Sequence, residues 1–361
     1  MNILQIAAYC ADFPGNFIFS LLCIGEKIQN EGGKVVYAFP DEARSKSWCI
    51  ELQKRSKVFF LPLSRARLNW KTYIKIRKIC QDEKIDIIHS HFELYDIPCL
   101  FTSKKIKIVW HLHDAIGGEK GLRSIIRKLQ YRYLTKRIVV VAISDDDRKS
   151  LLKLGCPKEK IYVILNGIST ASLSHIEIPK EYPIFLSMGW DYKRKGIDLI
   201  IEAAKRLREE CQNFKLLINC REETIAQIQE QVDINDEWIN IQLPQKNMSD
   251  IYSKANIFIQ ASRHETFSFA VCEASYVGLQ LIISDIPGME WARKFEKVRI
   301  FENENVDDLY CRMKEIVEEF PKLSWEYPMD KRMIEEKYST KRWANELYGV
   351  YEELLENESR T

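Results

Sequence analysis

The sequence lacks the long apolar runs that mark membrane proteins and the leader that marks secreted ones. No run approaches the roughly 18 apolar residues that a membrane-spanning helix needs. The first eight residues, MNILQIAA, carry no basic residue and lead into a polar stretch at Asp12, so they predict a first strand rather than a signal peptide. These absences favour a cytoplasmic protein.

Cysteine pairs with metal or redox spacing are also missing. Ten cysteines are present, but no two of them are spaced as C-x-x-C, which argues against a zinc ribbon and a dithiol redox motif. Most lie in apolar runs, as Cys23 and Cys272 do, and we expect reduced, buried thiols. The chain also has no internal repeat and no low-complexity segment.

What the chain does have is a charge asymmetry between its halves. Residues 1–180 contain 30 Lys and Arg against 18 Asp and Glu, a difference of +12, whereas residues 181–361 contain 24 against 34, a difference of −10. A length of 361 residues exceeds what one ordinary core accommodates. Together these observations predict two domains, the first of which favours anionic surfaces or acceptors.

Short apolar runs alternate with amphipathic stretches through both halves. This alternation predicts an α/β fold with a doubly wound parallel sheet in each half. The predicted strands are residues 3–8, 34–39, 58–62, 85–91, 107–113, 138–144 and 161–165, then 183–188, 214–219, 239–242, 256–260 and 280–284. The predicted helices include residues 17–29, 70–82, 196–209, 248–254, 269–277 and 340–357, with a linker near 169–182.

The strongest chemical signal is the segment SRHETFSFAVCE, residues 262–273. A strand leads into a loop that carries Glu265, and a helix opens near Ser268. Such a helix start offers backbone N–H groups and a positive dipole end to an anion. Glu273 lies two helical turns further on, so the two carboxylates can each accept hydrogen bonds from a diol. The alternative is a pair of surface glutamates on a solvated helix.

A second signal is the segment GWDYKRKG, residues 189–196, which follows the first strand of the second half. Arg194 and Lys195 stand at a strand-to-helix turn, where open parallel sheets bind ligands, and they can neutralise a pyrophosphate. A solvated basic pair is the alternative. In the first half, Gly15 in DFPGNF lets the backbone approach a phosphate closely, although a plain turn explains this loop equally well.

Five of the six histidines form the third signal: His89, His91, His111, His113 and His264. Strand periodicity places each H-x-H pair on one face at the end of a strand. Three interpretations stay open, namely a metal site, ordinary histidines at a sheet edge, and residues of a sugar-binding cleft. Glu93 and Asp114 are the only nearby carboxylates that complete a ligand set, and we expect no bound metal.

These motifs together resemble the retaining nucleotide-sugar glycosyltransferases of family 4, from Gly15 to the last helix. The resemblance implies that Glu273 binds the donor ribose, and that Glu265 lies by the transferred sugar. It assigns the donor phosphates to Arg194 and Lys195, and the reaction centre to His113. The further positions it implies are His264, Phe267, Ser268, Phe269 and Gly15 on the donor side, and His91 and Asn16 on the acceptor side.

The chain departs from the family pattern at several positions. Thr266 and Ser268 replace two glycines of the family's glutamate motif, and Trp190 stands where many members have arginine. The segments 218–223 and 241–252 have no glycine, whereas the family often has glycine in both. The identity of the nucleotide base therefore stays open.

The resemblance implies two Rossmann-like domains facing across a cleft, the architecture called GT-B. We expect an acceptor-binding domain over residues 1–175, a nucleotide-sugar-binding domain over 176–338, and a last helix over 339–361 that packs back on the first domain. The implied reaction moves a sugar to a glycan or lipid-linked glycan with retention of configuration, in cell-surface polysaccharide or glycoconjugate synthesis. It needs no cofactor and no divalent metal.

Three other functions remain: a nucleotide-sugar epimerase on the same fold, a catalytically silent partner subunit of a glycosyltransferase pair, and a metal hydrolase built on the H-x-H pairs. Nucleic-acid binding is not expected, because no recognised module is present.

A cluster of basic residues interleaved with apolar ones predicts a peripheral contact with an anionic membrane at its inner face. Its members are Lys120, Arg123, Arg127, Lys128, Arg132, Lys136 and Arg137. A packed helix with a solvated basic face is the alternative.

Overall fold

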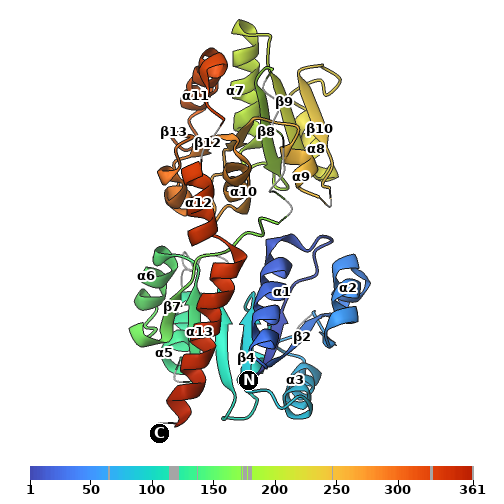
Figure 1. Ribbon diagram of the computed structural model, residues 1–361, viewed down its shortest axis with the longest axis vertical. Coiled ribbons are helices and arrows are strands. Elements are labelled where there is room, and N and C mark those ends of the chain that lie inside the picture. The colour runs from blue at the N-terminus through green and yellow to red at the C-terminus, as the bar shows by residue number, and fades with distance from the viewer. Residues whose placement is uncertain are drawn as a thin grey trace. The chain divides into compact units, whose positions relative to one another are not determined.

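The chain folds into two α/β units, seen here in a computed structural model (Figure 1). The structure describes residues 1–63, 66–113, 122–135, 137–171, 173, 177, 181–245, 247–325 and 328–359, without the side chains of residues 122–127, 328 and 357–359. Unit 1 comprises Met1–Gly167 and Thr340–Thr361, and unit 2 comprises Ile168–Ser339. In the part of the chain described, no helix is long and apolar enough to cross a bilayer.

Unit 1 is built on a seven-stranded parallel sheet with the order β3-β2-β1-β4-β5-β6-β7. Its strands are β1 Asn2–Ala7, β2 Lys34–Pro40, β3 Val58–Leu61, β4 Ile87–His91, β5 Lys107–His111, β6 Ile138–Ala142 and β7 Ile161–Val163. All seven correspond to predicted strands. Most strand residues are buried, as expected for a parallel sheet covered on both faces.

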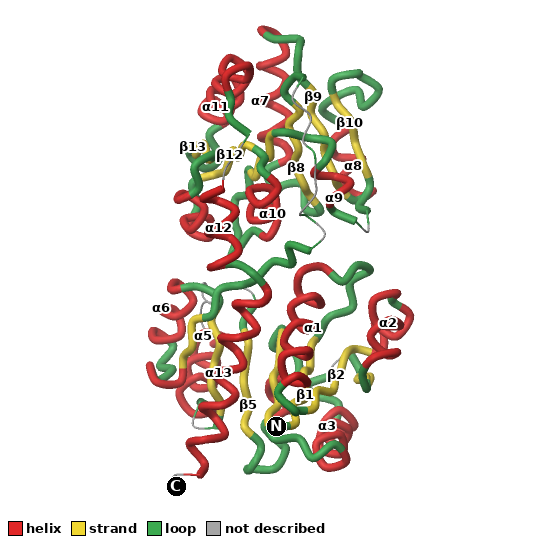
Figure 2. The backbone as a smooth tube through the Cα atoms, viewed as in Figure 1, coloured by secondary structure: helices red, strands yellow, loops and turns green. Residues whose placement is uncertain are grey.

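Helices cover both faces of this sheet (Figure 2). One face packs against α1, α2 and the last helix α13, and the other against α3 to α6. The helices are α1 Gly15–Asn30, α2 Ser47–Arg55, α3 Trp70–Asp82, α4 Asp96–Cys99, α5 Leu122–Leu134, α6 Asp145–Lys153 and α13 Thr340–Ser359. Trp343, Leu347 and Tyr351 are buried against the sheet, which explains why α13 belongs to unit 1 although it ends the chain.

Unit 2 has a six-stranded parallel sheet with the order β10-β9-β8-β11-β12-β13. The strands are β8 Ile184–Gly189, β9 Lys215–Cys220, β10 Ile239–Gln242, β11 Ile257–Gln260, β12 Gln280–Ser284 and β13 Val298–Phe301. The helices are α7 Ile197–Glu210, α8 Glu222–Gln229, α9 Ser249–Tyr252, α10 Phe269–Val277, α11 Val306–Glu319 and α12 Pro328–Lys337, with a 3-10 segment η3 Pro287–Lys294. The prediction omitted β13, a half-buried edge strand that carries Arg299.

The strand order of each sheet reverses between two central strands, at β1 and β4 in unit 1 and at β8 and β11 in unit 2. Ligands of open parallel sheets bind outside the carboxyl ends of the strands at such a switch point. In unit 1 these ends carry Ala7 and His91, and in unit 2 they carry Gly189 and Gln260. Most of the predicted site residues therefore follow the strands at which the topology favours a ligand, whereas His113 follows the neighbouring strand β5.

The boundary predicted after residue 175 is wrong, because unit 2 begins at Ile168. Ile168 is buried, its N–H group donates to the carbonyl of Tyr338 at 2.6 Å, and it forms a bridge with Ser339. The start of the expected linker thus pairs with the end of unit 2. The second boundary lies between Ser339 and Thr340, one residue after the predicted position.

Candidate active site

The loop between β8 and α7 holds the predicted phosphate-binding cations in a fixed turn. The Asp191 carboxylate accepts from the backbone N–H of Arg194 at 3.1 Å. Gly196 then starts α7 with a φ of +66°, and a Cβ at this position would lie 1.9 Å from the carbonyl oxygen of Ala261. Only glycine fits this close approach, which brings the loop against the segment after β11.

Glu265 lies in that segment and is nearly buried, at 9% exposure. Its Oε1 atom accepts hydrogen bonds from Lys195 Nζ at 2.5 Å and Ser262 Oγ at 2.9 Å, while Arg194 Nη1 lies 4.0 Å from Oε2. Gln260 Nε2 is a third donor to Oε1, at 3.3 Å. The structure thus brings together Glu265, Arg194 and Lys195, the residues that the sequence selected.

Further contacts hold the two loops together. The N–H group of Arg263 donates to the carbonyl of Arg194 at 2.9 Å, and its guanidinium binds both carboxylate oxygens of Asp198, at 2.9 and 3.0 Å. A Cβ on Gly288 of η3 would lie 1.9 Å from the carbonyl oxygen of Glu265. Because Gly288 backs the loop so closely, the backbone at Glu265 has little room to move.

Glu273 lies on α10 and is half-buried. Its Oε2 atom accepts from the hydroxyl of Tyr252 at 2.7 Å. Tyr252 is buried, and burial together with the neighbouring carboxylate raises the pKa of its hydroxyl well above the usual value. The neutral hydroxyl therefore donates at any ordinary pH and orients Glu273.

Ser268 is the N-cap of α10, since its Oγ accepts from the N–H of Val271 at 3.3 Å. This capping bond accounts for one amide of the first helical turn, while Phe269 and Ala270 supply the amides next to it. Ser268 Oγ also donates to Gln260 Oε1 at 3.3 Å. Serine at a family glycine position thus has a structural role here.

Two predicted donor contacts differ in their exposure. Phe267 is buried, and its ring stacks on Trp291 with a centroid distance of 4.6 Å, so a ligand contact by this side chain is not available. The aromatic packing of Phe267, Phe269 and Trp291 supports the loop instead. His264 is exposed on the same loop.

Trp190, which follows Gly189, was not predicted as a site residue. Its ring is 54% exposed, and the guanidinium of Arg194 lies 4.3 Å from the ring centroid, with Arg221 at 5.8 Å. Cation–π contacts of this kind orient the guanidinium and leave its N–H groups available. In the sequence, the position of Trp190 beside the cationic motif could have identified it as a site residue.

In unit 1, four histidines form one connected cluster on the face of the sheet that packs against α13. His91 Nδ1 lies 2.9 Å from His113 Nε2, and His89 Nε2 lies 3.2 Å from His111 Nδ1. Two residues that the sequence did not single out join the pairs: Gln5, 3.0 Å from His91 Nε2, and the Tyr351 hydroxyl, 2.5 Å from His89 Nδ1. In the sequence, Gln5 could have been identified as a polar residue within an otherwise apolar strand.

Burial keeps these imidazoles neutral. It lowers the pKa values of His89, His91 and His111 well below the usual 6.5, with the neighbouring imidazoles as a smaller cause. It lowers the pKa of His113 to about 3. All four histidines are therefore uncharged at neutral pH.

His91 was predicted to lie on the acceptor side, but it is fully buried and both of its nitrogens have partners in Gln5 and His113. A direct acceptor contact by His91 is therefore wrong for this structure. His113 follows β5 and is partly exposed. Its ring stacks on Phe92 at 4.3 Å, and Phe92 has the unfavourable φ of +63°, a strain that the surrounding packing maintains.

Gly15 and Asn16 open α1, so the predicted loop over residues 12–17 ends in the first turn of this helix. Gly15 has a φ of +53°, which favours glycine. The hydroxyl of Tyr9 donates to the carbonyl of Phe13 at 2.8 Å and fixes the loop before the helix.

Comparison with known proteins supplies the family. A model of "Glycosyltransferase Family 4" matches residues 25–172, and a model of "Glycosyl transferases group 1" matches residues 170–340. The two models together cover residues 25–340, and the chain is a family 4-like glycosyltransferase. It is 26% identical over 266 residues to an uncharacterized glycosyltransferase of Methanocaldococcus jannaschii, with 65% of each chain covered. It is 23% identical over 235 residues to N-acetyl-alpha-D-glucosaminyl L-malate synthase of Bacillus anthracis, with 60% of each chain covered.

The chain thus spans less than two thirds of the length of these curated relatives. Among solved structures, a glycosyltransferase of Rickettsia africae has a TM-score of 0.79 at 17% identity, with 99% of each chain covered. Anabaena HepE, solved in complex with UDP and glucose, has a TM-score of 0.79 at 13% identity, with 98% and 99% covered. These likenesses show that the chain has the GT-B fold with two Rossmann-like domains.

The histidine cluster also contains the one candidate metal-ligand group in the described part of the chain. His89, His91 and His111 have ring nitrogens within 4.8 Å of one another. A hydrolytic metal keeps a coordination position open to water or substrate, but these side chains are 0–1% exposed. Packing against Trp343 and Tyr351 of α13 makes the cluster a poor match to a hydrolytic centre.

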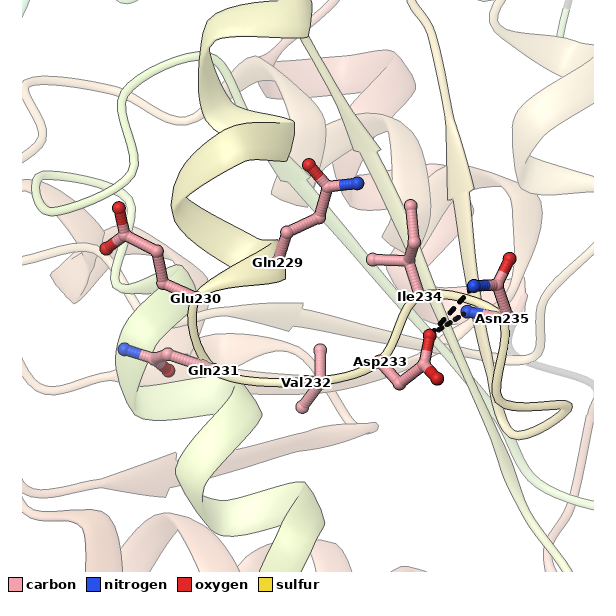
Figure 3. Close-up of a pocket in the computed structure, with 7 residues that line it drawn as sticks. All are labelled: Gln229, Glu230, Gln231, Val232, Asp233, Ile234 and Asn235. Atoms are coloured by element: carbon pink, nitrogen blue, oxygen red, sulfur yellow. Dashed lines mark hydrogen bonds between the residues drawn. The ribbon is translucent and has the colours of Figure 1, made fainter.

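A surface hollow of about 470 Å³ lies elsewhere in unit 2, lined by the end of α8 and the residues after it, from Gln229 to Asn235. Figure 3 shows these side chains, with Asp233 accepting from Asn235. The hollow precedes β10, so it lies at the amino-terminal edge of the sheet, opposite Glu265. The hollow therefore lies away from the cluster around Glu265, which follows the carboxyl ends of the strands.

Proposed function

We propose that the protein transfers a sugar from a nucleotide-sugar donor that unit 2 binds. The observation that carries this proposal is the convergence of Lys195, Arg194 and the two neutral donors Ser262 and Gln260 on the buried carboxylate of Glu265 at the switch point of the second sheet. A donor diphosphate can bind these cations as a second anionic partner. The backbone N–H groups at the helix start near Ser268 can donate hydrogen bonds to the same diphosphate.

The proposed roles follow from the contacts of each residue. Arg194 and Lys195 bind the diphosphate and stabilise the leaving group, so that fixed cations and helix dipoles replace a divalent metal. Glu273, oriented by Tyr252, accepts hydrogen bonds from the ribose. Glu265 accepts from hydroxyl groups of the transferred sugar, and His113 of unit 1 positions that sugar. The UDP complexes of HepE support a nucleotide sugar as the donor class.

We further propose transfer with retention of configuration to a glycan or lipid-linked glycan, in cell-surface polysaccharide or glycoconjugate synthesis. A donor phosphate oxygen accepts the acceptor's proton while attack proceeds on the same face of the sugar. A double displacement requires a carboxylate beside the anomeric carbon. Glu265 has its carboxylate bound to Lys195 and Ser262, which favours the first route.

A peripheral contact with an anionic membrane through Lys120 to Arg137 is also part of the proposal. Lys120 and Lys136 lie outside the described residues, as do the side chains of residues 122–127, but the side chains of the last turns of α5 are described. Leu129 and Tyr133 are 51% and 57% exposed beside the exposed Lys128 and Arg132. Exposed apolar side chains among cations suit the surface of an anionic bilayer.

The same face of the sheet carries a second exposed apolar set before α3, on α3 and after α4, formed by Leu68, Trp70, Ile74 and Phe101. Its neighbours Lys71, Lys75 and Lys78 are exposed, and no acidic residue occurs between positions 66 and 81. In vesicle co-sedimentation we expect Leu129→Ser and Trp70→Ser to weaken binding to anionic vesicles, with neutral vesicles as the control. Binding that both changes leave intact contradicts the membrane contact.

The deciding experiment is a panel of nucleotide sugars tested by thermal shift, because a bound donor raises the melting temperature. The stabilising donor is then incubated with candidate acceptors, and NMR of the product gives its anomeric configuration. Arg194→Ala is expected to lower turnover more than donor affinity, whereas the matched control Lys193→Ala, which removes a cation paired with Asp198, leaves both unchanged.

Each other outcome has a distinct meaning. Conversion of the donor without an acceptor indicates an epimerase, and donor binding without any transfer indicates a silent partner subunit. Activity that a chelator abolishes and a divalent cation restores contradicts the metal-independent mechanism. If no nucleotide sugar stabilises the protein, the proposed function is wrong.

A further inference from the structure

The histidine cluster forms one unbranched chain of hydrogen bonds through unit 1. It runs from His113 through His91, Gln5, Tyr351 and His89 to His111, with donor–acceptor distances between 2.5 and 3.2 Å. The proposed function uses His113 alone. The other five members are fully or almost fully buried, so any effect they have on a ligand must pass through His113.

The proton positions along this chain follow from Gln5. Its Nε2 group donates to the Tyr351 hydroxyl at 3.0 Å, so its Oε1 atom accepts from His91 Nε2. A neutral imidazole has one N–H donor and one bare acceptor nitrogen. His91 Nδ1 is therefore bare and accepts from His113 Nε2, which leaves His113 Nδ1 as a bare acceptor.

The same rule gives the proton positions in the other part of the hydrogen-bond chain, from Tyr351 to His111. The Tyr351 hydroxyl accepts from Gln5, so its single proton goes to His89 Nδ1. His89 Nε2 then donates to His111 Nδ1, and the remaining proton of His111 lies on Nε2. That atom is buried and has no hydrogen-bond partner among the described residues.

The direction of donation along these hydrogen bonds matters, because the reverse direction would also give every neutral imidazole one donor and one acceptor nitrogen. If the Gln5 amide turned over, every proton would shift by one atom, and His113 would present an N–H donor at Nδ1 instead of an acceptor. In the structure the Nε2 group of this amide faces the Tyr351 hydroxyl and its Oε1 atom faces His91. The chemistry at His113 thus depends on residues that do not touch it.

We propose that Gln5 and Tyr351 are positioning residues that lock His113 in the Nε2–H tautomer, so that its Nδ1 atom accepts a hydrogen bond from a sugar hydroxyl. The contact with the sugar rests on the proposed function, whereas the tautomer does not. A fixed acceptor at this atom selects a ligand that presents a hydroxyl donor and disfavours one that presents only an acceptor.

The test is a long-range 1H–15N spectrum of the ligand-free protein labelled in histidine, with the His113 signals assigned from the His113→Gln variant. We expect a protonated Nε2 and a bare Nδ1, with no change between pH 8 and pH 6. In Tyr351→Phe, which leaves the Gln5 amide without its anchor, we expect a mixture of both tautomers. The matched control Tyr348→Phe, on the same helix, keeps the single tautomer.

Kinetics provide the second measurement. With a transferable donor, Tyr351→Phe should lower kcat/KM by about tenfold, the effect of one weakened hydrogen bond. Tyr348→Phe should change it by less than about twofold. Gln5→Met, which removes both amide groups, should match Tyr351→Phe in tautomer and rate.

The outcomes separate the two proposals. A His113 with its proton on Nδ1 in the unmodified protein, or a single unchanged tautomer in both Tyr351→Phe and Gln5→Met, overturns the positioning role. If the tautomers behave as expected but no nucleotide sugar binds, the proposed function fails and the hydrogen-bond chain stands.

Discussion

The two units place polar groups at the same topological position but stabilise them by different means. Unit 1 gathers four neutral imidazoles, three of them buried, in a chain of hydrogen bonds with Gln5 and Tyr351. Unit 2 buries one carboxylate and pairs it with Lys195 and Arg194. A neutral network fixes geometry without a net charge, whereas an ion pair keeps cations ready for a second anion. The comparison teaches that unit 1 is suited to positioning and unit 2 to charge stabilisation.

The largest effect is expected from Gly196→Ala, which tests whether the loop geometry of unit 2 is obligatory. The new Cβ would meet the Ala261 carbonyl at 1.9 Å, so we expect a loss of more than about 3 kcal/mol in the free energy of unfolding. Gly32→Ala in unit 1 is the control, because Gly32 has a φ of +75° but no atom within 4 Å of the new Cβ, and it should cost about 1 kcal/mol. Urea denaturation measures both, and equal losses would contradict the close approach.

The next effect concerns charge stabilisation. Lys195→Met removes the closest cation from Glu265, and we expect kcat to fall by about a hundredfold to a thousandfold, as for other groups that stabilise a developing charge. Lys193→Met is the control, since Lys193 pairs with Asp198 on the outside of the loop. Steady-state kinetics with the donor selected in the panel decide the point. A fall that appears in KM alone indicates that Lys195 binds the donor without acting on the leaving group.

Acidification should lower the stability of unit 1 more than that of unit 2. The folded-state pKa of each clustered histidine lies below the usual 6.5, and that of His113 is about 3. Below pH 6.5 the unfolded chain therefore binds protons that the folded chain does not, and stability falls as the pH falls towards 3. Each histidine contributes up to about 1.4 kcal/mol per pH unit in this window.

Hydrogen exchange measured between pH 7.5 and pH 5.5, corrected for the intrinsic exchange rate, provides the readout. We expect β4 and β5 to lose protection, while β8 and β11 retain theirs. Protection of β4 and β5 that stays constant across this range would show that the buried histidines do not set the acid stability of unit 1.

The smallest effect is expected at the ribose contact. Glu273→Ala should weaken donor binding by about tenfold to a hundredfold, the range for hydrogen bonds to a charged group, with little change in kcat. Glu223→Ala on the exposed side of α8 is the control. Isothermal titration calorimetry measures the affinity, and unchanged donor binding in Glu273→Ala would remove Glu273 from the site.

Much of the fold could be predicted because parallel strands buried on both faces leave a strong apolar pattern. All seven strands of unit 1 and five of the six in unit 2 follow apolar runs. The missing strand, β13, lies at an edge and carries Arg299, so its pattern is weak. The domain boundary was misplaced because Ile168 pairs with Ser339, a contact between positions far apart in the chain.

The candidate site also has features that the sequence predicts and features that only the tertiary structure decides. The sequence by itself determined which residues gather at the carboxyl edges of the two sheets, since the carboxyl ends of parallel strands meet at one edge: His113, Glu265, Arg194 and Lys195 are such residues. Only the tertiary structure decided what each of them touches. Gln5, Tyr351 and Tyr252 reach the site from distant segments, and Phe267 and His91 turn inward, because hydrogen-bond partners and burial depend on packing that no local pattern records.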